Sequence, residues 1–120
     1  MVVSNGNHPI VVVPHMKGGE GEMIQEHLVS QEDLGKAGRL FARGILKPGH
    51  SVGMHFHDID MEICYFLSGT GVVIENDTEI PVGPGDVNLV RPGEGHEIRN
   101  TSASEDLVYM AVVLYPNGIA

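Results

Sequence analysis

Hydrophobic and polar residues alternate along most of this chain, and glycine- and proline-rich turns interrupt the alternation at short intervals. A period of two predicts strands with one apolar and one polar face. The predicted strands are 10–14, 22–29, 39–46, 53–57, 61–67, 72–75, 78–82, 87–90, 97–99 and 107–114. Helical periodicity is confined to 30–38, where Ser30 can cap a short turn with Asp33 reaching back.

Short strands joined by Gly/Pro turns indicate an all-β sandwich or barrel. The pair Asn76-Asp77 suits a tight hairpin turn between two of these strands. We expect one barrel domain over 21–120, preceded by an N-terminal arm over 1–20. The strand at 10–14 in that arm would lie at a sheet edge or be exchanged with a second subunit.

Composition narrows the class of protein. The chain has 120 residues, of which 42% are hydrophobic and 19% charged, enough for a single buried core. A net charge of −9 with only seven Lys and Arg offers no basic stripe, so nucleic acid is set aside as a partner. Cys64 is the sole cysteine, and neither a secretory nor a membrane-spanning segment is evident, so we expect a cytoplasmic protein.

Three histidines and one glutamate form the candidate metal site. On an extended strand His55 and His57 point to the same face, and a turn at 58–60 lets Glu62 begin a returning strand beside them. His96 follows in a second glycine-rich segment. Imidazole and carboxylate suit one divalent first-row ion per chain, such as iron, manganese, nickel, copper or zinc. His8, His15 and His27 have no partners at ligand spacing.

The spacing of these residues resembles the two motifs of the cupin superfamily, in its small single-domain (cupin 2) form. The first motif is matched by Gly49-x5-His55-x-His57-x4-Glu62-x6-Gly69. The second is matched by Gly85-x5-Arg91-x-Gly93-x2-His96-x3-Asn100. Arg91 replaces the usual proline of the second motif, with Pro92 one place later. The resemblance implies a double-stranded β-helix, or jelly-roll barrel, with His55, His57, Glu62 and His96 as metal ligands. It also implies a homodimer.

Strand parity suggests which other side chains approach the site. Cys64 and Phe66 share the face of Glu62, and Ile98 shares the face of His96, so these three are candidates for lining a pocket. Arg39 and Arg43 belong to the outer face of their strand. Arg43 would reach a substrate anion only if a bulge inverted that parity. Asp58 and Asp60 are interpreted as turn formers.

A small-molecule enzyme is the first functional hypothesis. No general base is evident beyond the ligands, which slightly favours dioxygenase-like chemistry over an isomerase, epimerase or lyase reaction. The alternative is a non-catalytic cupin that binds or senses a small ligand. The partners expected are a small molecule and a second copy of the chain, with no nucleic acid and no membrane; catalytic residues, substrate and native metal stay open.

Overall fold

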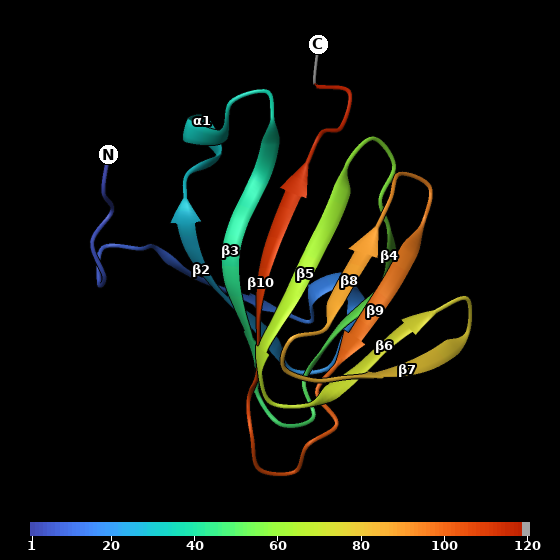
Figure 1. Ribbon diagram of the computed structural model, residues 1–120. Coiled ribbons are helices and arrows are strands. Elements are labelled where there is room, and N and C mark those ends of the chain that lie inside the picture. Colours follow the sequence, from blue (N-terminus) through green and yellow to red (C-terminus); the bar gives the residue numbers. More distant parts are fainter. Residues whose placement is uncertain (119–120) are drawn as a thin grey trace.

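The computed structural model describes residues 1–118 and confirms the all-β prediction. Figure 1 shows strands throughout the molecule. Over residues 1–118, helical structure is limited to two short segments, η1 (Met16–Gly18) and α1 (Gln31–Leu34). The strands are β1 (Ile10–Pro14), β2 (Glu22–Val29), β3 (Gly38–Leu46), β4 (Ser51–Phe56), β5 (Met61–Ser68), β6 (Gly71–Glu75), β7 (Thr78–Val82), β8 (Val87–Val90), β9 (Gly95–Arg99) and β10 (Leu107–Leu114). Over the described part of the chain, no helix has the length and apolar character needed to cross a membrane.

The strands form two antiparallel sheets. The larger has the order β1-β2-β3-β10-β5-β8 and the smaller the order β4-β9-β6-β7 (Figure 1). Neighbours such as β3 and β10 are far apart in the sequence, so the chain passes repeatedly between the sheets, as in a jelly roll. The predicted double-stranded β-helix is confirmed. β1 pairs with β2 of its own chain, with Ile10 opposite Glu26.

Local features follow from the residue types. Asn76 and Asp77 both adopt positive φ, as a two-residue hairpin turn requires. Ser30 caps α1, its Oγ accepting the amide hydrogen of Asp33 at an N–O distance of 3.0 Å. β4 and β9 each begin two residues earlier than predicted.

A bulge in β4 sets the direction of the first candidate ligand. Val52 pairs with Ile98 and His55 pairs with His96, so three steps along β4 match two steps along β9. The extra residue shifts the alternation, and both Val52 and His55 consequently face the barrel interior.

The core fills one end of the barrel, and a cavity occupies the other. Along β5 the inward residues change from Glu62 at the cavity to Phe66 in the core. Along β10 they change from Val113 at the cavity to Leu107 in the core. The packed end therefore supplies the rigid base on which polar side chains at the other end are held.

Candidate metal centre

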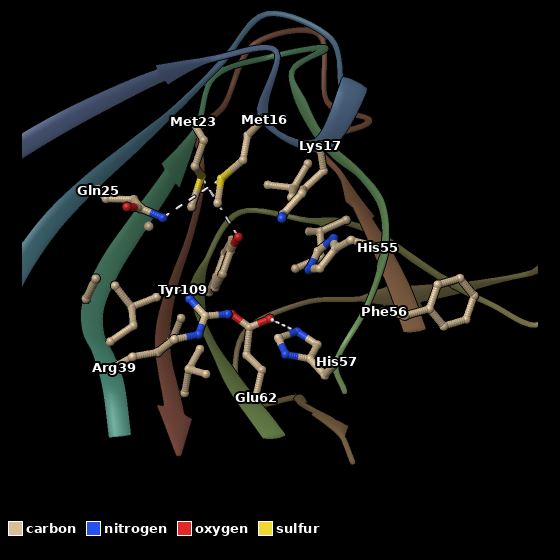
Figure 2. A pocket seen from close by; sticks show the side chains of 17 residues that line it. Met16, Lys17, Met23, Gln25, Arg39, His55, Phe56, His57, Glu62 and Tyr109 are labelled. Atoms are coloured by element: carbon tan, nitrogen blue, oxygen red, sulfur yellow. Dashed lines mark hydrogen bonds and ion pairs between the residues drawn. The ribbon is translucent and has the colours of Figure 1, made fainter. Parts of the chain in front are cut away.

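His55, His57, Glu62 and His96 converge between the two sheets. Each offers a ligand atom, and these atoms all lie within 4.8 Å of one another. The Nε2 of His96 lies 3.1 Å from the Nε2 of His55 and 2.9 Å from Oε1 of Glu62. The Nε2 of His57 lies 3.3 Å from the same oxygen. Figure 2 shows His55, His57 and Glu62 gathered at one side of the cavity.

Each of the three imidazoles is oriented through its Nδ1 atom. The Nδ1 of His55 donates to the carbonyl oxygen of Gly53 at 2.8 Å, and the Nδ1 of His57 donates to Oδ1 of Asp60 at 2.8 Å. The Nδ1 of His96 lies 2.6 Å from Oδ1 of Asn88. Because all three partners are acceptors, the neutral rings carry their proton on Nδ1 and direct the Nε2 lone pair inward.

This donor set fits a metal ion. The Nε2 of His57 is buried and, when the ring carries its proton on Nδ1, meets no donor among the described residues, because Oε1 of Glu62, at 3.3 Å, is itself an acceptor. A buried lone pair without a partner raises the free energy of the folded state unless it binds a cation or a proton. The contacts of 2.9–3.3 Å also resemble the separation of about 3 Å expected for adjacent ligands each about 2.1 Å from one ion.

The electrostatics of the cluster are those of a site prepared for positive charge. Burial opposes ionisation of Glu62, but its contacts with His57 and His96 outweigh burial and lower its pKa to about 2. The Glu62 carboxylate in turn raises the pKa of His57. Burial lowers the pKa of His55, which keeps that imidazole neutral and available as a ligand.

Asp60 is more than a turn former, which corrects the sequence interpretation. It is buried, with an exposed fraction of 7%, and its Oδ2 accepts a 2.7 Å hydrogen bond from Nε of Arg39. Asp60 thereby links Arg39 to the ring of His57. The arginine, expected on the outer face of β3, is exposed but reaches the cavity through its long side chain.

A second polar chain supports His96. The amide nitrogen of Asn88 donates to Oε1 of Glu75 at 2.7 Å, which fixes the amide so that its oxygen faces His96. Asn88 lies on β8 and Glu75 at the end of β6, so each sheet contributes one member. Neither residue was identified from the sequence.

The cavity above the cluster has a volume of about 180 Å³. Its wall combines apolar side chains with Gln25, Tyr109 and Lys17 (Figure 2). Ile98 lines it. Cys64 and Phe66 do not: both are fully buried in the core beyond the cavity.

Arg43 also lies away from the cavity. Its side chain is on the outer face of β3, with its Nη1 3.6 Å from Oε1 of Glu26. The parity of β3 is therefore not inverted at this residue, and the apolar set that includes Ala42 and Leu46 faces the barrel interior.

The comparisons with known proteins agree with this architecture. Residues 42–113 match the family model described as a cupin domain. The chain is 41% identical over 114 residues to an oxalate-binding protein of Thermotoga maritima, covering 95% of this chain and 93% of that protein.

Solved structures extend the comparison. The crystal structure of a predicted oxalate decarboxylase from Thermotoga maritima is similar, with a TM-score of 0.87 and 42% identity, covering 96% of this chain and 99% of the other. A polyketide cyclase from Streptomyces resistomycificus has a TM-score of 0.75 at 22% identity, covering 98% and 82% respectively. The second likeness concerns the fold alone.

Proposed function

Because the chain belongs to the cupin family, we propose that it holds one divalent first-row ion and binds a small carboxylate, oxalate above all, at that ion. His55, His57, Glu62 and His96 would hold the ion. When bound, the ion supplies positive charge and coordination positions open to a small anion. The observation that carries the proposal is the buried, unpartnered Nε2 of His57 beside three other inward-facing ligand groups.

The charges around the cavity make anion binding depend on the ion. Glu62 is ionised and would repel an anion in the metal-free protein. The charge of Asp60 is already matched by Arg39. A divalent ion reverses the sign at the cluster, and a cavity of about 180 Å³ suits a compact ligand. The names of the two Thermotoga proteins support oxalate as the first anion to test.

Proton-transfer groups are scarce in the cavity. Among the described residues that line it, Glu62 is the only carboxylic acid, and it is a proposed ligand. The lining imidazoles, His55 and His57, are proposed ligands too. Lys17 and Tyr109 are the other lining residues able to carry a proton, so catalysis by proton transfer would depend on one of these two side chains.

Turnover is the second candidate. The name of the similar predicted decarboxylase supports the splitting of oxalate, with uptake of one proton, to carbon dioxide and formate. The dioxygenase-like reaction favoured from the sequence, and the isomerase, epimerase or lyase alternatives, stay predictions. With oxalate as the substrate, decarboxylation yields formate whereas oxidation consumes oxygen, so these two outcomes can be separated in one experiment.

The test compares metal-free protein with protein loaded with Mn²⁺, Fe²⁺, Ni²⁺, Cu²⁺ or Zn²⁺. Calorimetry with oxalate should show binding only to a loaded form, with metal content measured afterwards because oxalate can extract an ion. Formate, carbon dioxide, hydrogen peroxide and oxygen uptake are followed in parallel. Absence of product supports a binding protein, whereas formate identifies a decarboxylase. Equal oxalate binding without metal would contradict the proposal.

A further inference from the structure

Lys17 has a backbone conformation that few lysines adopt. Its φ is 55° and its ψ is 30°, within the left-handed region, and His15 two residues earlier has φ 48°. Residues with a Cβ avoid this region, and those held in it depend on surrounding structure. The consequence here is a sharp turn in η1 beside the cavity. Lys17 lines that cavity, and Figure 2 shows its amino group pointing inward on the side of His55.

The turn around Lys17 is fastened to β4. The amide of Glu20 donates to Oγ of Ser51 at 2.8 Å, and the amide of Ser51 donates to the carbonyl oxygen of Glu20 at 2.9 Å. Gly19 and Gly53 let the two backbones meet. A Cβ on Gly53 would collide with the carbonyl oxygen of Lys17. The backbone of Lys17 is thus held in place independently of its own side chain.

The charge of Lys17 is unmatched within the described part of the chain. All four arginines lie within 4.0 Å of a carboxylate oxygen, as Arg39 does with Asp60. Lys17, Lys36 and Lys47 form no ion pair there, and of these three lysines only Lys17 lines the cavity. Lys17 is exposed, so water can solvate its charge, but its place in the cavity wall leaves the ammonium available to an anionic ligand in a chain whose net charge is −9.

We infer that Lys17 is a specificity-determining residue that binds the outer carboxylate of a dianionic ligand whose other carboxylate lies at the metal cluster. This inference rests on the proposed function and adds to it the preferred substrate class, dicarboxylates over monocarboxylates. An ammonium suits this role because charge-assisted hydrogen bonds are about twice as strong as neutral ones. Gln25 and Tyr109 offer only neutral donors, and Arg39 is already bound to Asp60.

The test uses full-length Zn²⁺-loaded protein, titrated with oxalate and with formate. Lys17→Met keeps the length of the side chain but removes its charge, and Lys17→Arg keeps the charge. Lys36→Met is the matched control, because Lys36 is exposed and lies away from the cavity. Far-ultraviolet circular dichroism and Zn²⁺ content establish that each variant is folded and loaded.

We expect Lys17→Met to weaken oxalate binding about tenfold or more, as for loss of a charged hydrogen bond, with formate binding and Zn²⁺ content unchanged. Lys17→Arg should restore most of the affinity for oxalate, and Lys36→Met should match the wild type. Equal losses for formate and oxalate, or an unchanged affinity for oxalate, overturn the inference alone. Wild-type protein that binds neither anion overturns the proposed function as well.

Discussion

The buried imidazole of His57 is held by Asp60, three residues later, through a 2.8 Å hydrogen bond from Nδ1 to Oδ1. The second oxygen of Asp60 is held by Arg39. Because this carboxylate fixes both the tautomer and the orientation of the ring, a residue outside the proposed ligand set contributes to the geometry of the candidate metal centre.

Replacing Asp60 with alanine should weaken metal binding without removing it. Loss of an orienting partner typically lowers metal affinity by roughly 10- to 100-fold. Competition with a chromophoric chelator measures the change. Asp58→Ala is the control, since Asp58 occupies the same turn but is exposed. Equal affinities for both variants would show that the Asp60–His57 hydrogen bond does not support the site.

Replacing a ligand itself should have a larger effect. His55→Ala or Glu62→Ala deletes one of the four converging donor groups. We expect either variant to lose stoichiometric metal together with oxalate binding. Elemental analysis after dialysis gives the metal content. His27→Ala should retain the ion, because His27 bonds Gln25 and lies outside the cluster. Full occupancy in the Glu62 variant would mean that the carboxylate ligand is misassigned.

The metal-free protein should lose stability in acid through Glu62. Its pKa is lowered from 4.5 to about 2, so its stabilising contribution is complete above pH 4.5 and is lost as pH falls towards 2. Urea midpoints measured over this range should fall more steeply for the wild type than for Glu62→Gln. Curves of equal slope would show that the ionised carboxylate is not preferentially stabilised by folding.

A homodimer is expected through the N-terminal strand. β1 pairs on one side only, and Ile10, Val11 and Val12 are exposed by 60%, 41% and 48%. Apolar side chains gathered on an edge strand favour contact with another chain. Sedimentation equilibrium should give twice the mass of the chain, and Val11→Lys should shift the protein towards monomer. A monomeric wild type contradicts the prediction.

Much of the fold follows from alternation and turn residues. Strands such as 22–29 and 107–114 have the same limits in the structure as in the prediction. The second of these is a continuous apolar run flanked by polar residues, which marks a strand buried in the sheet. The limits of β4 differ because its first residue is set by pairing with Arg99, a partner forty-eight positions away. Pairing at that distance leaves no local signal.

The site could be predicted only in part. The four ligands share a spacing that both strand parity and motif resemblance identify, and the structure brings them together. The role of Asp60 as the partner of His57 was not predicted. Aspartate in a turn is usually a turn former, and outside a strand no alternation of faces indicates where a side chain points. Asn88 reaches His96 from a different sheet. Lys17 owes its direction to a positive φ that is rare for lysine.

The attachment of η1 to β4 separates the proposed contact with the ligand, made by Lys17, from the proposed binding of the ion. Because hydrogen bonds and close backbone contacts at glycines hold the backbone at position 17, the Lys17 side chain is not needed to keep this turn in place. A change of one codon can therefore alter which ligand is accepted while leaving the ion-binding residues untouched. Substitution at this one position could therefore change the specificity of the same barrel towards small molecules of different charge.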